Sequence, residues 1–398
     1  MRTVTVVGAS LAGLYAARTL RAQGFDGRLV IVGDEPHLPY DRPPLSKDFL
    51  TGRTGEPQLA LTDAEESAEI DAEWLLGVRA DGLDTRSRTV VLADGRTVAT
   101  DGLVIATGAA ARRLPGDALR GVHTLRTLED ARALRAELTA GPRRVVVIGG
   151  GFIGAETASS CRLLGHDVTV VEAAPLPLVP HLGTNMAAVC AALHRRAGVE
   201  LVTGAAVAGF RRSGTNPASV AAVELRDGRA LPADVVVVGV GAVPNTEWLA
   251  GSGLAVRDGV VCDAGCVTAL PNVVAVGDVA RVDGSRAEHW TSATEQPHAA
   301  VANLLAGRTI ETAQSLPYFW SDQYGARIQF AGRRQPQDTV RIVEGDLHDG
   351  APADGGFLAV YERDHRATAV LAVDRPRPFT RARRQLALDA DRMEPAPR

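Results

Sequence analysis

A β-branched run, a glycine-rich turn and a helical segment follow one another at two places in this chain, and this pattern constrains the fold most strongly. In the second copy, residues 144–148 (RVVVI) precede residues 149–154 (GGGFIG), which match G-x-G-x-x-G. The next predicted strand ends at Glu172, eighteen residues after Gly154. This context is typical of a turn that holds a dinucleotide pyrophosphate at a helix N-terminus, with an acid at a ribose. The predicted contacts are Gly149, Gly151, Phe152, Ile153, Gly154 and Glu172.

The acid at the end of this unit also bears on which dinucleotide is bound. The Glu172 carboxylate can accept hydrogen bonds from a ribose 2′-hydroxyl and would repel a 2′-phosphate. Ala173 and Ala174 follow it, and neither could hold that phosphate. The sequence therefore predicts NADH rather than NADPH.

The first copy lies at the start of the chain. Residues 3–7 (TVTVV) predict a strand, Gly8 permits the tight turn, and Gly13 permits close packing of the following helix. Ser10 stands where the middle glycine is usual, and a glycine turn without a ligand remains the alternative. A second strand ends in acids about twenty residues further on, where a ribose carboxylate is expected. The candidate contacts are Gly8, Ser10, Leu11, Ala12, Gly13, Asp34 and Glu35.

Two such units in one chain indicate two dinucleotides, which is the arrangement of a flavoprotein reductase that binds FAD and NADH. Three further segments, residues 103–108, 234–245 and 272–278, predict buried parallel strands that end in small-residue turns. Ligands of open α/β sheets bind at the carboxyl ends of such strands, where Asp278 could bond flavin ribityl hydroxyls. These segments add Ala106, Thr107, Gly108, Gly241, Gly277 and Asp278 to the cofactor-binding candidates.

Bulk composition excludes several other classes of protein. A chain of 398 residues is long enough for two or three domains. The net charge of −4 gives no general nucleic-acid signature, and no apolar run is long enough for a membrane span. The N-terminus predicts a first strand rather than a signal peptide, so a cytoplasmic protein is expected. The four scattered cysteines suit reduced thiols, and no residue pattern suggests a metal site.

Lys47 is the single lysine among the 43 cationic side chains, and it lies in residues 40–47 (YDRPPLSK). Everywhere else the chain uses arginine, which cannot replace a compact, titratable ammonium in a tight site. Chance survival of one lysine is the alternative. The placement favours a functional lysine beside a flavin.

These motifs together resemble the oxygenase-coupled, NADH-dependent ferredoxin reductases of the putidaredoxin and rubredoxin reductase type. The segments that carry the resemblance are residues 33–35 with 40–47, 125–130 (LRTLED), 149–156 and 319–324 (FWSDQY). The resemblance covers essentially the whole chain. It implies an α/β fold with two Rossmann-like domains and a C-terminal α+β domain. The expected FAD domain is split between residues 1–110 and 234–310, around an NAD domain at 111–233, and the C-terminal domain spans 311–398.

By position, the resemblance assigns a set of residues to FAD: Ala12, Asp34, Arg42, Lys47, the Ala80 backbone, Arg126, Asp278 and Trp290. Trp290 precedes a predicted helix whose N-cap is expected at Thr291 or Ser292. That helix's positive end could stabilise the N1–C2 edge of reduced flavin. Ordinary core packing is the alternative for Trp290.

The resemblance also implies the reaction. Electrons pass from NADH through FAD, one at a time, to an iron–sulfur ferredoxin that serves a haem monooxygenase or a ring-hydroxylating dioxygenase. The catalytic candidates are Lys47 and Glu156, which we expect to form an ion pair that rearranges when NADH enters. The alternative for Glu156 is a solvated acid or an acid of the N-terminal turn of its helix.

The positions of the cysteines argue against two related classes of flavoprotein. Residues 34–58 contain no cysteine, whereas disulfide reductases and thiol-peroxidatic NADH oxidases need one or two there. Cys262 and Cys266 are interpreted as structural. Two alternatives stay open: a stand-alone NADH oxidase or quinone reductase, and a flavin redox sensor resembling apoptosis-inducing factor. Residues 375–384 carry five arginines and no acid, so they are a candidate docking face for an acidic ferredoxin.

Overall fold

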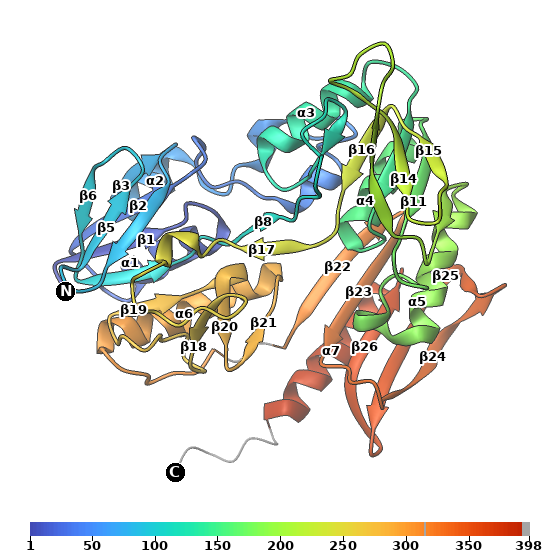
Figure 1. The fold of residues 1–398 in the computed structure, drawn as a ribbon. Coiled ribbons are helices and arrows are strands. Elements are labelled where there is room, and N and C mark those ends of the chain that lie inside the picture. Colours follow the sequence, from blue (N-terminus) through green and yellow to red (C-terminus); the bar gives the residue numbers. More distant parts are fainter. Residues whose placement is uncertain (314–315, 392–398) are drawn as a thin grey trace. The chain divides into compact units, whose positions relative to one another are not determined.

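A computed structural model describes residues 1–313 and 316–391 of the chain. These residues form two compact units, shown as a ribbon in Figure 1. Unit 1 comprises Met1–Asp41, Glu56–Ala110 and Ala242–Pro317. Unit 2 comprises Arg42–Gly55, Ala111–Gly241 and the chain from Tyr318 onward.

A five-stranded parallel sheet forms the centre of unit 1. Its strand order is β19 (Val273–Ala275), β7 (Gly102–Ile105), β1 (Thr3–Val7), β2 (Arg28–Gly33) and β3 (Ala72–Leu76). Alternate side chains of these strands belong to two separate apolar clusters, one on each face of the sheet. Burial on both faces explains why the strands read as continuous β-branched runs in the sequence.

Helices α1 (Leu11–Ala22) and α6 (Trp290–Ala306) pack against each other on one face of this sheet (Figure 1). The remaining helix is α2 (Ala64–Ile70), with the 3-10 turns η2 (Glu56–Leu59), η3 (Glu247–Leu249) and η4 (Gly277–Val279). Three small sheets complete the unit. They are β4 (Ala80–Asp84) with β5 (Thr89–Leu92) and β6 (Thr97–Ala99), β8 (Ala109–Ala111) with β17 (Ala242–Pro244), and β18 (Val260–Cys262) with β20 (Ala280–Val282) and β21 (Ser285–Arg286).

Unit 2 contains a second five-stranded parallel sheet. Its order is β12 (Glu200–Val202), β11 (Asp167–Val171), β10 (Arg144–Ile148), β16 (Val235–Val238) and β9 (Val122–His123). Its helices are α3 (Leu128–Leu138), α4 (Phe152–Leu163) and α5 (Val179–Arg196), with the 3-10 turn η1 (Pro43–Ser46). A capping box between Thr127 and Asp130 starts α3, and Gly183 interrupts the helical backbone of α5. A three-stranded sheet follows: β13 (Val207–Arg212), β14 (Val220–Leu225) and β15 (Ala230–Pro232).

The C-terminal part of unit 2 is an antiparallel sheet with one helix. The strand order is β22 (Tyr318–Gln323), β23 (Ala326–Gly332), β26 (Arg366–Val373), β25 (Ala351–Arg363) and β24 (Thr339–His348), and α7 (Pro376–Asp391) follows. Apolar side chains of this sheet form one cluster with the buried face of α5. The expected sheet-rich C-terminal module is therefore present.

The expected boundary at residue 234 differs from the structure. Residues Val235–Val238 form β16, which pairs in parallel with β10 inside the second sheet, so unit 1 resumes only at Ala242. Residues Arg42–Gly55 also cluster with unit 2, although they were expected in the first domain. Leu50 packs in the unit 2 core and the guanidinium of Arg135 lies over the Phe49 ring, which explains this placement. Hydrophobic runs alone cannot tell which of two similar parallel sheets a strand will join.

Candidate functional site

The first glycine turn connects β1 to α1 in unit 1. Gly8 has a φ of +123°, and a Cβ there would lie 2.0 Å from the Ala106 carbonyl oxygen. A Cβ on Gly13 would lie 1.8 Å from the Gly8 carbonyl oxygen. Both positions therefore require glycine, because the backbone of β7 and the start of α1 close onto this turn. The predicted roles of these two glycines in the turn are confirmed.

The carboxyl ends of β7 and β19 reach the same edge of the sheet as this turn. Gly277 has a φ of +74°, and a Cβ on it would lie 2.9 Å from the Ala12 Cβ. The Gly277 N–H donates to Gln296 Oε1 at 2.7 Å. Thr107 Oγ1 donates to the Asn245 carbonyl, and Asn245 Nδ2 donates back to the Thr107 carbonyl, both at 2.8 Å. Sequence reasoning did not identify Gln296 or Asn245 as parts of this edge.

The acids after β2 and the aromatic residue at α6 complete the unit 1 candidates. Tyr40 donates a short hydrogen bond from its hydroxyl to Glu35 Oε2. Trp290 is half-buried, and its Nε1 donates to Asp41 Oδ1 at 3.3 Å. The expected N-cap at Thr291 or Ser292 was wrong by about two residues. The extended backbone of His289 occupies the N-cap position, so α6 begins at Trp290 and both hydroxyl residues are buried in its first turn.

These features of unit 1 fit the dinucleotide that the sequence predicts. A turn with no room for side chains lets a pyrophosphate approach the backbone at the start of α1. Asp34 follows β2 and Asp278 follows β19, so both acids stand at carboxyl ends of strands. Ala80 is the first residue of β4, and its side chain is buried.

The second glycine turn, in unit 2, connects β10 to α4. A Cβ on Gly149 would lie 2.2 Å from the Gly239 carbonyl oxygen, and one on Gly154 would lie 2.0 Å from the Gly149 carbonyl oxygen. Gly151, at the N-cap of α4, has no protein atom within 4 Å of where its Cβ would be. Its surroundings are therefore open to a ligand, as are those of Gly241. Ile153, in the first turn of α4, exposes 47% of its surface.

The acid at the end of β11 is bonded directly to this turn. Glu172 Oε2 accepts from the Gly150 N–H and Oε1 accepts from the Ala174 N–H, both at 2.8 Å. These bonds fix the carboxylate beside the turn, and each oxygen keeps a further lone pair for a ribose hydroxyl. The geometry fits the predicted second dinucleotide and its 2′-hydroxyl.

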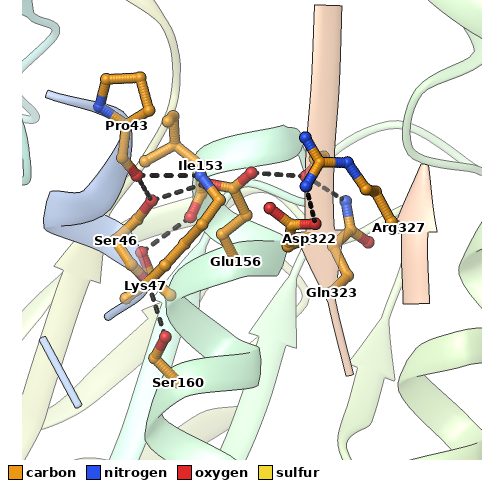
Figure 2. Close-up of polar contacts among 11 residues, drawn as sticks. Pro43, Ser46, Lys47, Ile153, Glu156, Ser160, Asp322, Gln323 and Arg327 are labelled. Atoms are coloured by element: carbon orange, nitrogen blue, oxygen red, sulfur yellow. Dashed lines mark hydrogen bonds and ion pairs between the residues drawn. The ribbon is translucent and has the colours of Figure 1, made fainter. Parts of the chain in front are cut away.

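The expected ion pair between Lys47 and Glu156 is confirmed. Lys47 Nζ lies 2.7 Å from Glu156 Oε2 and also donates to the Pro43 carbonyl at 2.9 Å (Figure 2). The Glu156 side chain is 3% exposed and that of Lys47 is 16% exposed. Glu156 lies in the first turns of α4, directly after the glycine turn, and it is not the solvated acid of the alternative interpretation.

Three hydroxyl residues that sequence reasoning missed complete this cluster. Ser46 Oγ donates to Glu156 Oε2 at 2.6 Å, and Ser321 Oγ donates to Oε1 at 2.7 Å. Ser160 Oγ donates to the Ser46 carbonyl at 2.6 Å. Ser46 and Ser321 lay inside two of the segments that carried the family resemblance, which was the only signal that could have found them.

Arg42 and Arg126, both assigned to FAD by the resemblance, lie together in unit 2. Arg42 Nη1 donates to the Arg126 carbonyl at 2.7 Å. The Arg126 N–H donates to Asp130 Oδ2 at 2.9 Å, the same carboxylate oxygen that caps α3. The cap of α3 therefore orders the backbone on which these two arginines meet.

All four cysteines are free thiols with buried side chains. Burial raises the pKa of Cys161, Cys190 and Cys262 to about 12, and it also raises the pKa of Cys266. Thiols with such pKa values are unreactive near neutral pH, which supports a structural role for Cys262 and Cys266. In the described parts of the chain no cluster of three or more His, Cys, Asp or Glu suits a metal ion, and none of the helices is long and apolar enough to cross a membrane.

Comparisons with known proteins give consistent matches along the chain. Residues 2–297 match the family described as pyridine nucleotide-disulphide oxidoreductase, and residues 318–396 match the family described as reductase C-terminal. The chain is 36% identical to putidaredoxin reductase of Pseudomonas putida, with 98% of this chain and 93% of that protein covered. It is 38% identical to the ferredoxin–NAD(+) reductase component of the Paraburkholderia xenovorans biphenyl dioxygenase system, with 96% and 92% covered. Its fold matches the reductase in a crystal structure of the covalent putidaredoxin reductase–putidaredoxin complex, with a TM-score of 0.89, 34% identity, and 97% and 93% of the two chains covered.

Proposed function

Because this chain belongs to the ferredoxin–NAD(+) reductases of the pyridine nucleotide-disulphide oxidoreductase family, we propose that it passes electrons from NADH through FAD to an iron–sulfur ferredoxin serving an oxygenase. The observation that carries this function is the presence of two dinucleotide turns together with a C-terminal module that matches the reductase C-terminal family. The absence of cysteine from residues 34–58 removes the thiol chemistry of neighbouring oxidases and disulfide reductases. The terminal oxygenase is a haem monooxygenase or a ring-hydroxylating dioxygenase.

The residues that would hold FAD lie mainly in unit 1. The turn from Gly8 to Gly13 would take the pyrophosphate, Asp34 the ribose, and Asp278 the ribityl hydroxyls. Bound FAD supplies the conversion between the two electrons of a hydride and the single electrons that an iron–sulfur cluster accepts. Trp290, beside Asp41 at the start of α6, would limit the space open to the cofactor.

The second turn would bind NADH. The N-terminus of α4 and the open space at Gly151 suit its pyrophosphate, and Glu172 would accept from the ribose 2′-hydroxyl. A 2′-phosphate would meet a carboxylate that two backbone N–H groups hold in place, so NADPH would be rejected by charge repulsion. Specificity for NADH follows from this residue.

Lys47 and Glu156 are proposed as the charged pair that governs the approach of the nicotinamide. Glu156 follows the glycine turn on α4, and it holds the ammonium of Lys47 with a carboxylate that is almost fully buried. We expect the pair to rearrange when NADH enters, because the incoming ring displaces water and changes what surrounds the ammonium. Lys47 would then present its charge to the flavin.

The docking face for the ferredoxin is proposed on α7. Arg377, Arg381 and Arg384 repeat at helical spacing and are exposed, whereas Phe379 and Leu386 on another face of α7 are buried. Arg383 lies over the Tyr318 ring at 4.2 Å, and Tyr318 stacks on Trp320 at 5.7 Å, which joins the basic helix to an aromatic patch on β22. An acidic ferredoxin complements this surface, and the charges would mainly raise its association rate.

A cytoplasmic location is part of the proposal. Four free, buried cysteines support a reducing compartment, in which disulfides are rare.

The function is tested by mixing the purified FAD protein anaerobically with NADH, and separately with NADPH, in a stopped-flow spectrometer. Rapid bleaching of the flavin band by NADH alone is expected, followed by reduction of an added [2Fe–2S] ferredoxin. In a separate assay with oxygen or a quinone as acceptor, fast reduction that ferredoxin does not stimulate would instead identify a stand-alone NADH oxidase or quinone reductase. Slow turnover with a long-lived reduced complex would identify a redox sensor.

A further inference from the structure

We infer that Ser321, on the first strand of the C-terminal module, is a positioning residue that fixes the Glu156 carboxylate as the acceptor for Lys47. This inference rests on the proposed function, since it assigns a task within the Lys47–Glu156 pair. It also gives the C-terminal module a part in the chemistry at the NADH side, in addition to any part in partner docking.

The two faces of β22 have different surroundings. Ser321 and Gln323 are 0% and 1% exposed, whereas Trp320 and Asp322, which alternate with them, are half-buried. Because side chains of a strand alternate between its faces, one face of β22 is directed at α4 and the other away from it. Asp322 on the second face contacts Arg327 rather than Glu156 (Figure 2).

Ser321 on the inner face of β22 and Tyr324, the residue directly after this strand, both bond to α4. Ser321 Oγ donates to Glu156 Oε1 at 2.7 Å, and the Tyr324 N–H donates to Ser159 Oγ at 2.7 Å. Only the first of these bonds touches the carboxylate. The second therefore provides a control, since it joins the residue that follows the same strand to the same helix without contacting Glu156.

The direction of the Ser321 hydrogen bond follows from its neighbours. Gln323 Nε2 donates to Ser321 Oγ at 3.0 Å, and an ionised carboxylate only accepts hydrogen bonds. The Ser321 hydroxyl therefore accepts from Gln323 and donates its proton to the Glu156 carboxylate. Gln323 comes from the same buried face and keeps that hydroxyl oriented.

The donors to Glu156 divide between its two oxygens. Oε2 accepts from Ser46 and Lys47, which are neighbours on the segment around η1. Oε1 accepts from Ser321, which is 165 residues away in sequence. Without Ser321, the two remaining described side-chain donors, Ser46 and Lys47, would both bond to Oε2, and the carboxylate could rotate. The distance and direction of the Lys47 ammonium would then change, because Glu156 is its charged partner.

The test uses the fact that Lys47 is the single lysine of the chain. Protein produced with ¹³C-labelled lysine gives one Cε–Hε correlation by NMR, and this reports on the surroundings of Lys47 without requiring turnover. Wild type and Glu156→Gln define the paired and unpaired positions of this signal. We expect Ser321→Ala to move the signal toward the Glu156→Gln position, Ser321→Thr to restore it, and Ser159→Ala to leave it at the wild-type position.

The kinetic arm measures flavin reduction at saturating NADH. We expect Ser321→Ala to slow this step by about tenfold, within the range for a misplaced group near a reaction centre, with little change in the NADH dissociation constant. In a Lys47→Met background, Ser321→Ala should add no further loss, because it acts through Lys47.

The outcomes separate the two proposals. If Lys47→Met does not slow flavin reduction, the proposed role of Lys47 fails, while the NMR comparison still decides whether Ser321 positions the pair. A lysine signal in Ser321→Ala that stays at the wild-type position, with FAD bound, would overturn the inference. So would an equal shift in Ser159→Ala, since the effect would then come from loosening β22 as a whole.

Discussion

Removal of the Lys47 ammonium should both destabilise the protein and slow its reduction by NADH. In Lys47→Met the side chain keeps a similar length, but the Glu156 carboxylate, with only 3% of its side chain exposed, loses the ammonium group that it is paired with. Breaking a buried pair by removing one partner costs about 3–5 kcal/mol. Ser46 and Ser321 still donate to the carboxylate, so we expect about 3 kcal/mol, at the lower end.

A double variant separates the cost of leaving a buried carboxylate unpaired from the cost of losing the lysine side chain's contacts. Lys47→Met combined with Glu156→Gln removes both charges, so it should be more stable than Lys47→Met alone. Arg53→Met is the control, because Arg53 and Asp48 form an ion pair on the same segment at 3.8 Å with both side chains more than half exposed. Loss of that surface pair should cost less than about 1 kcal/mol.

The assay is urea unfolding followed by circular dichroism and by flavin fluorescence, with FAD content checked for each variant. Stopped-flow reduction by NADH is measured on the same samples. Our description of the Lys47–Glu156 pair would be contradicted if the effects of Lys47→Met and Glu156→Gln on the free energy of unfolding were additive in the double variant. It would also be contradicted if Lys47→Met matched Arg53→Met in both assays.

Three further predictions concern other parts of the molecule. Glu172→Gln removes the charge that opposes a 2′-phosphate and keeps an acceptor for the Gly150 N–H. We therefore expect kcat/KM for NADPH to rise by about tenfold or more and kcat/KM for NADH to fall. An unchanged ratio of these two kcat/KM values would refute the role of Glu172. Changing Arg377, Arg381 and Arg384 on α7 to Gln should lower kcat/KM for ferredoxin and flatten its salt dependence, while NADH–ferricyanide activity stays constant. The control is Arg211→Gln, which removes an arginine from an exposed ion pair on β13. An equal effect of this control on kcat/KM would argue against a docking face on α7. Burial lowers the pKa of His194 from 6.5 to about 4, with a smaller contribution from Arg195, and its ring contacts the Tyr324 hydroxyl at 2.8 Å. The folded-state pKa lies below the unfolded one, so this stability is complete above pH 6.5 and is lost as the pH falls toward 4. Urea midpoints should drop over that window in the wild type and less in His194→Gln, and parallel curves would contradict this.

The glycine turns illustrate how far local reasoning reaches. Gly8 and Gly149 need positive φ, and Gly13 and Gly154 sit where any Cβ would overlap a carbonyl oxygen, so the spacing of these glycines predicted both turns correctly. The position of Glu172 at the second turn followed from the same unit. Its bond to the Gly150 N–H shows that a carboxylate placed by strand length alone can reach the turn.

Prediction was less successful where two similar elements compete. The run at residues 235–238 is as apolar and β-branched as the strands of unit 1, yet its partner is β10. The start of α6 was misplaced because Thr291 and Ser292 are good capping residues, whereas the backbone at His289 decides where the helix begins. In the first case a strand distant in sequence supplies the deciding contacts, and in the second the local backbone overrides the capping preference of the side chains.

The sequence by itself determined the two dinucleotide turns, the acid at the end of the second unit and the single lysine, because backbone sterics, strand length and residue identity act locally. Tertiary structure alone decided what surrounds that lysine. Ser46 and Ser321 meet Glu156 across 110 and 165 residues of chain, and no local pattern encodes that convergence. A buried carboxylate must be surrounded by donors, and only the packing of η1, α4 and β22 determines which residues supply them.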